Sequence, residues 1–202
     1  MTLSHTERTH SPLDAADIIT AVRALAPEIQ SRGDEIAALR RLPIDLVQKL
    51  KAAGVFRMAM PKAWGGPEMT PREQCEVYEV LGAADASVAW CAKIGSDSGY
   101  FAAQLDEEAA RTLYPDLDFV TAGQVPPNGL GERVDGGYRL SGHWTFGSGC
   151  THADVIGAGF LVTENGKPAW RRAASAHRLR SGLALRDHRH LAQHRSRRQR
   201  QQ

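Results

Sequence analysis

Hydrophobic residues in the first half of the chain recur every three or four positions, the period of an α-helix. The pattern covers residues 13–31, where Pro27 is expected to kink or divide the helix, and it returns over residues 43–53 and 70–83. Each of these segments can bury one face. Residues 85–94 are apolar on most sides, which predicts a helix buried inside a bundle. The first half of the chain therefore predicts an all-α domain.

Residues that favour helix ends lie at the borders of these segments. The side-chain oxygens of Thr70, Asp85 and Asp106 can each accept a hydrogen bond from the first turn of a helix. Pro43 suits the first turn of a helix, and Gly54 suits its C-terminal end. These borders support a helical interpretation as far as about residue 114.

Strand patterns replace the helical period in the next part of the chain. Residues 119–125 predict a strand that ends before two prolines, and residues 155–163 predict a second, apolar strand. Residues 134–146 begin with the hairpin signal Asp-Gly-Gly and then alternate apolar and polar side chains. Residues 164–167, with their Asn-Gly step, predict another hairpin turn. This order of elements predicts strands joined by tight turns.

The predicted fold class is α+β, an all-α helical N-terminal domain followed by an incomplete antiparallel β domain and an irregular basic tail. The expected boundaries are a disordered N-terminus over residues 1–13, the helical domain over 14–116, the partial β domain over 117–170 and the tail over 171–202.

The tail differs sharply in composition from the rest of the chain. Residues 171–202 hold 10 of the 25 Lys and Arg residues but one of the 23 acidic residues, Asp187. A nucleic-acid-binding arm and a solvated end are two interpretations. The preferred hypothesis is an out-of-frame translation, because the tail begins where a strand is due and lacks Lys, Ile, Val and Phe.

The overall composition narrows the class of protein. No run of eighteen apolar residues suggests a membrane span, and the N-terminus lacks the apolar core of a secretion signal. Three widely spaced cysteines predict reduced thiols in the cytoplasm, and no Cys/His spacing indicates a metal site. A cytoplasmic protein without a metal is therefore expected.

The segment Gly147-Ser148-Gly149 is the main candidate for cofactor chemistry. Its hydroxyl lies between two residues without side chains, so a flat ligand could approach the backbone closely; an ordinary turn is the alternative. His152 could serve as an acid or base, although a structural hydrogen bond is the preferred interpretation. Cys150 is interpreted as an inert thiol, because no cationic residue flanks it.

Three segments, taken in order, resemble the acyl-CoA dehydrogenase superfamily, including its flavin-dependent monooxygenase branch. They are LPIDLVQKLKAAGVFRMAMPKAWGGPEMT, EVYEVLGAADASVAWC and TAGQVPPNGLGERVDGGYRLSGHWTFGSGCTHAD. The resemblance covers roughly residues 14–170, and the ordered set is more specific than a single glycine motif.

The resemblance implies a flavin cofactor, FAD with FMN as the alternative. It places Ser148 near flavin N5, Phe146 beside the isoalloxazine ring, and the backbone of Gln124 and Val125 at the pyrimidine edge. It places Trp90 on the substrate side. The family's catalytic groups belong to a C-terminal helical bundle beyond this chain, and its members assemble as homotetramers.

The preferred function is α,β-dehydrogenation of acyl thioesters, in a truncated chain expected to bind flavin weakly or not at all and to lack turnover. The alternative is a flavin-dependent monooxygenase acting on an aromatic or polycyclic substrate. That branch tends to carry a histidine where this chain has Ser96-Asp97-Ser98, which argues for the dehydrogenase. A non-enzymatic binding module with a basic nucleic-acid-binding tail is the remaining interpretation.

Overall fold

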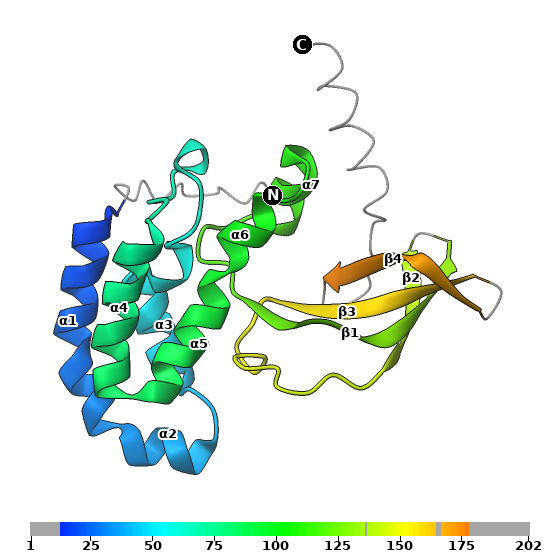
Figure 1. Cartoon of the computed structure of the whole chain (residues 1–202). Coiled ribbons are helices and arrows are strands. Elements are labelled where there is room, and N and C mark those ends of the chain that lie inside the picture. The colour runs from blue at the N-terminus through cyan, green and yellow to red at the C-terminus, as the bar shows by residue number, and fades with distance from the viewer. Residues whose placement is uncertain (1–12, 136, 165–166, 178–202) are drawn as a thin grey trace, which may run out of the picture.

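The computed structural model describes residues 13–135, 137–164 and 167–177, without the side chains of the last strand. A helical bundle lies beside a small twisted sheet, and the chain passes from one to the other once (Figure 1). The predicted order, helices followed by strands, is confirmed. Within the described part of the chain, no helix combines the length and apolar composition needed to cross a membrane.

The bundle begins and ends its helices close to the predicted positions. Thr70 caps α4 through a capping box with Glu73, and Asp85 and Asp106 cap the next predicted helices. Pro27 lies inside α1 without dividing it. The helices are α1 (Ala15–Ser31), α2 (Gly33–Leu39), α3 (Ile44–Ala52), α4 (Pro71–Ala84), α5 (Ala86–Ser96), α6 (Ser98–Ala102) and α7 (Glu107–Leu113), with the short 3-10 helices η1 (Val55–Arg57) and η2 (Lys62–Trp64).

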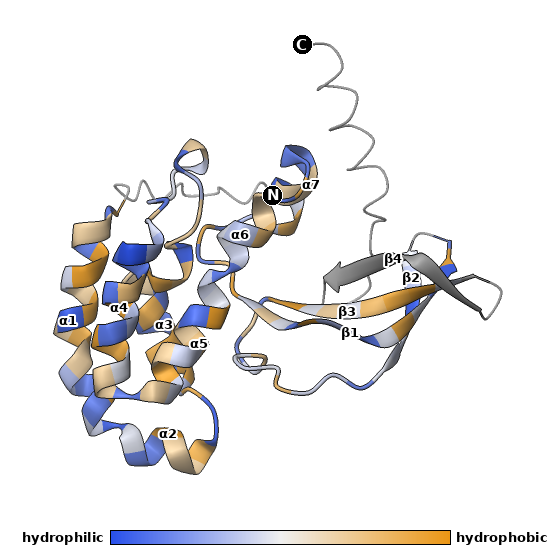
Figure 2. Ribbon diagram, viewed as in Figure 1, coloured by the Kyte–Doolittle hydropathy of each residue, from blue (hydrophilic) through white to orange (hydrophobic). Residues whose placement is uncertain are grey.

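The main hydrophobic core lies between α1, α3, α4 and α5. Their apolar stripes face one another, as the orange sides of these helices indicate in Figure 2. The fully buried side chains at its centre are Ile18, Val22, Ile29, Leu46, Leu50, Phe56, Val77, Leu81 and Val88. Val120, which directly precedes β1, also belongs to this core, so the start of the sheet is packed against the bundle.

The sheet contains four strands in the order β2-β1-β3-β4. They are β1 (Thr121–Val134), β2 (Gly137–Gly142), β3 (Val155–Glu164) and β4 (Lys167–His177). Both predicted hairpins are present, because β2 pairs antiparallel with β1 and β4 pairs antiparallel with β3. The expectation of a wholly antiparallel sheet is wrong for β1 and β3, which run parallel.

The parallel pair follows from the path of the chain between β2 and β3. β2 returns along β1 and ends opposite Gly129, and residues 143–154 then continue back to the start of β1. β3 therefore begins beside Thr121 and runs in the same direction as β1. The predicted hairpin arm over residues 134–146 accordingly ends early, and its last four residues leave the sheet.

β1 was expected to end before Pro126, yet the strand continues to Val134. The prolines instead interrupt its pairing, since the ladder with β3 stops at Gln124 and resumes at Gly129. Proline has no N–H to donate to a neighbouring strand, so residues 125–128 bulge out of the sheet. This bulge is the first structural feature of the candidate site.

The last strand extends beyond the segment that the sequence predicted. Pro168, Ala169 and Trp170 were expected to begin a strand that then dissolves, but β4 continues to His177. The remaining tail, residues 178–202, and the N-terminal residues 1–12 lie outside the described residues. The out-of-frame hypothesis for the tail stays a prediction.

Polar contacts join the bundle to the sheet. Asp154, just before β3, accepts hydrogen bonds from Lys51 Nζ and from the Val120 N–H, each at 2.9 Å. The hydroxyls of Ser98 and Thr121 lie 2.8 Å apart, fully buried. These bonds tie the starts of β1 and β3 to the helices, so the elements that carry the site keep a fixed position relative to α5.

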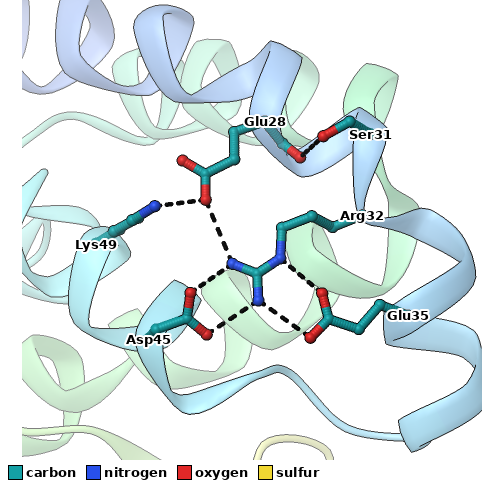
Figure 3. A network of polar contacts seen from close by, with 6 residues as sticks. All are labelled: Glu28, Ser31, Arg32, Glu35, Asp45 and Lys49. Atoms are coloured by element: carbon teal, nitrogen blue, oxygen red, sulfur yellow. Dashed lines mark hydrogen bonds and ion pairs between the residues drawn. The ribbon is translucent and has the colours of Figure 1, made fainter.

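A second polar network joins the helices on the far side of the bundle. Arg32, between α1 and α2, donates to the carboxylates of Glu28, Glu35 and Asp45, while Lys49 donates to Glu28 (Figure 3). The hydrogen bond from Arg32 lowers the pKa of Asp45 to about 2. The network therefore couples the packing of α3 against α1 to the ionisation of one carboxyl group.

Replacing Asp45 with Asn is expected to flatten the acid dependence of stability. The folded pKa of Asp45 lies below its ordinary value of 3.8, so its contribution is complete above that pH and is lost as pH falls through the interval down to about 2. Urea unfolding at a series of pH values from neutral to acid measures the slope. An unchanged slope in Asp45→Asn would show that the ion pair does not hold in solution.

Candidate functional site

The loop over residues 146–149 is a tightly bent segment beyond β2, with Phe146 exposed and residues 147–149 half-buried. Phe146 adopts a left-handed backbone conformation, with φ +55°, and its side chain is 91% exposed. The Ser148 N–H donates to the Phe146 carbonyl at 2.8 Å, and the Cys150 N–H donates to the Gly147 carbonyl at 3.0 Å. A non-glycine residue in this conformation carries backbone strain, as Arg40 and Glu68 also do in this chain, and such residues cluster at functional sites and turns.

A side chain from the helical bundle contacts this loop directly. The Nε1–H of Trp90, on α5, donates to the Oγ of Ser148 at 2.8 Å. Trp90 was expected inside a buried helix; its neighbours Val88 and Ala92 are buried, but the indole itself is 57% exposed. The Trp90 ring is exposed because its side chain points towards the loop and not into the bundle core. The structure thus brings together two candidates from different domains.

A second contact holds the same loop on α5. Burial raises the pKa of the Cys91 thiol, and a hydrogen bond from the Gly149 N–H acts in the opposite direction. Gly149 therefore lies near the Cys91 thiol, next to the hydrogen bond between Trp90 and Ser148. The Trp90 bond holds the loop against α5 and restricts the positions that Ser148 can adopt.

Gln124 and Val125 lie at the start of the β1 bulge. The amide of Asn128 donates to Gln124 Oε1 at 3.1 Å across the bulge, and Val125 is 69% exposed. Gly159, on β3, lies beneath it so closely that a Cβ there would overlap the carbonyl oxygens of Val125 and Pro126. Residues 125–128 are therefore unpaired with β3, although the carbonyl groups of Val125 and Pro126 pass close over Gly159.

Trp144 and Gly159 connect the bulge with the arm that leads to Ser148. The Trp144 Nε1–H donates to the Gly159 carbonyl at 2.8 Å, and its ring packs against Phe160. The sequence pattern did not assign a role to Gly159, although a glycine inside an apolar strand is the usual sign of a close backbone approach. Ser148 accepts a hydrogen bond from Trp90, whereas Gln124 accepts one from Asn128. The loop with Ser148 and the bulge with Gln124, which together form the expected site, are therefore held by separate hydrogen bonds.

His152 does not make the structural hydrogen bond that its sequence context favoured. Both of its ring nitrogens are buried, and neither has a hydrogen-bond partner among the described residues. The ring packs beside Phe56 at 6.2 Å between centroids, and burial, followed by the nearby Lys51 charge, lowers its pKa. His152 is therefore a neutral ring that helps to pack the loop end against the bundle.

Replacing His152 with Phe is expected to remove one source of acid sensitivity. The folded pKa of His152 lies below its ordinary value of 6.5, so the unfolded chain takes up the proton first and stability falls as pH drops below that value. His152→Phe keeps an aromatic ring beside Phe56 and should unfold with a flatter pH dependence through this range. Thermal unfolding of both proteins at matched pH values is the measurement. Parallel pH profiles would show that His152 is already solvated when folded.

The donors and surfaces at this site fit a flat heteroaromatic ring such as a flavin. Ser148 Oγ accepts one hydrogen bond from Trp90 and keeps its own O–H and one lone pair for a ligand. The Phe146 ring is almost fully exposed and can cover an aromatic face. Val125 is an exposed residue of the bulge, without a pairing partner on β3. Polar edge contacts and an apolar face are what such a ring requires.

Comparison with known proteins identifies the family. Residues 14–115, the helical bundle, match the family described as Acyl-CoA dehydrogenase, N-terminal domain. The chain therefore belongs to the acyl-CoA dehydrogenase superfamily.

Within this superfamily, the chain is similar to several individual monooxygenases. The chain is 38% identical over 154 residues to the indole-3-acetate monooxygenase of Acinetobacter baumannii, which covers 75% of this chain and 39% of that protein. The crystal structure of the HsaA monooxygenase from Mycobacterium tuberculosis superposes with a TM-score of 0.76 at 31% identity, over 84% of this chain and 44% of that one. XiaF from Streptomyces sp., solved in complex with FADH2 and glycerol, gives a TM-score of 0.75 at 25% identity, over 81% and 41% of the two chains.

The chain spans about 40% of the length of the curated relatives that it matches. Those relatives are named as monooxygenases, HsaA as a flavin-dependent one, so they support the monooxygenase alternative better than the preferred dehydrogenase. This support runs against the argument drawn from the missing histidine at Ser96-Asp97-Ser98.

Proposed function

We propose that this chain carries the helical domain and the flavin-facing strands of a flavin-dependent monooxygenase that hydroxylates an aromatic substrate. The observation that carries the proposal is the bent loop with the exposed ring of Phe146 and the Ser148 hydroxyl, held by Trp90 of the helical bundle. The names of the relatives, which include an indole-3-acetate monooxygenase, support an aromatic substrate over an acyl thioester.

The site residues have separate roles in this proposal. Ser148 offers its hydroxyl to the flavin near N5, Phe146 covers the ring, and the backbone of Gln124 and Val125 meets the pyrimidine edge. The exposed face of the Trp90 indole offers an aromatic substrate a surface for stacking. A bound reduced flavin would supply the two electrons that let dioxygen give one oxygen atom to the substrate and the other to water.

FAD is the proposed cofactor, with FMN as the alternative, because the related XiaF structure holds FADH2. The homotetramer implied by the family resemblance stays a prediction, which light scattering of the purified protein tests.

A single-turnover assay tests the proposal on the protein as it is. Excess chain is mixed with reduced flavin, isotopically labelled dioxygen and indole-3-acetate, and mass spectrometry follows the substrate. The family's catalytic groups belong to the C-terminal bundle, so we expect a low yield of product even in a single pass. That product should carry one labelled oxygen atom, and Ser148→Ala should reduce its yield about tenfold, the effect of one hydrogen bond to a reacting group. Ser141→Ala, at an exposed position of β2, is the matched control.

Two results would contradict the proposal. The first is reduction of an artificial electron acceptor by an acyl thioester without any oxygen incorporation. That result would favour the dehydrogenase function over the monooxygenase function. The second is labelled product whose yield is the same in the Ser148→Ala and Ser141→Ala variants.

A further inference from the structure

We propose that Trp90 is a positioning residue, which fixes the direction of the Ser148 hydroxyl so that its proton points away from α5 and towards the ligand. The inference rests on the proposed function and adds to it a role for the helical domain in preparing the flavin contact. It starts from the side-chain hydrogen bond that links Trp90 with Ser148 across 58 positions of sequence.

The chemistry of the two groups fixes the polarity of this bond. An indole Nε1–H can only donate, so the Ser148 oxygen must accept. The pair formed by Tyr78 and Ser96 in the same bundle differs, because either of those hydroxyls could be the donor at 2.7 Å. A hydroxyl held by an indole therefore cannot reverse its bond, whereas a hydroxyl held by another hydroxyl can.

The backbone of the loop removes the competing donor at this residue. The Ser148 N–H is already bonded to the Phe146 carbonyl at 2.8 Å. A ligand approaching Ser148 consequently meets the side-chain hydroxyl, with its proton and one lone pair available. These two groups suit a ring nitrogen in either of its protonation states, because the hydroxyl can donate to a bare nitrogen or accept from an N–H.

The position of Trp90 also joins two parts of the site. Its N–H holds the loop while its ring remains 57% exposed, and it lies beside Cys91, whose thiol lies near Gly149. A substrate that stacks on the ring would therefore press on the group that orients Ser148. A purely structural tryptophan would be expected to bury more of its ring in a hydrophobic core.

The first test needs no flavin. The chain contains 4 tryptophans, so labelling them with a nitrogen isotope gives four indole N–H resonances, and Trp90→Phe identifies one of them. We expect the Trp90 resonance to exchange slowly with solvent in spite of the exposed ring, to lose that protection in Ser148→Ala, and to keep it in Ser148→Thr. A Trp90 resonance unaffected by Ser148→Ala overturns the proposal.

The second test separates positioning from simple structural support. Flavin affinity is measured for the wild type, Trp90→Phe, Ser148→Ala and the double variant. Each single change should weaken binding about three- to tenfold, the range of one hydrogen bond, and the double variant should be no weaker than Ser148→Ala alone. Additive losses would overturn the positioning role. If the resonance behaves as expected but no variant binds flavin, the proposed function fails while the hydrogen bond between Trp90 and Ser148 stands.

Discussion

Gly159→Ala is expected to destabilise the chain by about 3 kcal/mol, the upper range for overpacking at a site that cannot relax. The new Cβ would overlap the carbonyl oxygens of Val125 and Pro126, and these are backbone atoms that cannot rotate away. To make room, the bulge must separate from β3, which also moves the backbone proposed to meet the flavin. Urea unfolding followed by circular dichroism measures the loss.

Gly33→Ala is the matched control for this prediction. Gly33 is the first residue of α2, and a Cβ there would meet no atom within 4 Å. Alanine has the higher helix propensity, so Gly33→Ala should leave stability unchanged or raise it by up to about 1 kcal/mol. Equal and small effects of the two substitutions would contradict the close approach at Gly159.

Asp118→Asn is expected to cost about 2–3 kcal/mol, somewhat less than a fully buried ion pair because the site is only partly enclosed. Arg57, on η1, donates from both Nε and Nη2 to the Asp118 carboxylate, and the two side chains are 13% and 15% exposed. The hydrogen bonds that Arg57 donates to Asp118 raise the pKa of Arg57. A guanidinium is not deprotonated in proteins, so Arg57 keeps its charge when its partner is lost. The amide would leave that charge without its counter-ion at the entrance to β1.

An exposed ion pair provides the control for Asp118. Arg72 and Glu76 lie 4.0 Å apart on α4, with side chains 91% and 45% exposed. Glu76→Gln should change the free energy of unfolding by no more than about 0.5 kcal/mol, as solvent-exposed pairs usually do. If Asp118→Asn costs no more than Glu76→Gln in the same chemical denaturation experiment, Arg57 and Asp118 do not form an enclosed ion pair in solution.

The sequence predicted those parts of the fold that depend on local chemistry. Thr70 and Asp85 mark helix starts because their side chains bond the first turn, whatever the rest of the chain does. The turn at residues 164–167 was predicted for the same reason, since β3 and β4 pair on either side of it. Such signals act within a few residues and can be read directly.

Other features depend on contacts between distant segments and could not be predicted in the same way. The parallel pairing of β1 with β3 follows from the course of residues 143–154, and the bulge exists because Gly159 lets the strand carrying Pro126 pass closely over β3. Strand pairing of this kind is set by tertiary packing more than by residue preference.

The candidate site likewise contains some features that local sequence predicts and others that depend on contacts between distant segments. Ser148 and Phe146 were selected from a local pattern and a resemblance, and the structure shows them in a bent loop with the Phe146 ring exposed. The hydrogen bond to Trp90 was outside the reach of the sequence, because helical periodicity does not say which element covers an outward ring. The prediction for His152 failed similarly, since no sequence pattern shows whether a buried imidazole finds a partner.

The central claim, that the bulge and the loop face a flavin, is tested most directly by titrating the chain with FAD while recording its amide resonances. Weak binding is sufficient for this measurement, because chemical shifts respond in proportion to the fraction bound. The account predicts saturable shifts concentrated at residues 124–128 and 146–149 and at the indole of Trp90. Shifts confined to the outer faces of α1 and α3, or no saturable shift at the bulge and the loop, would contradict it.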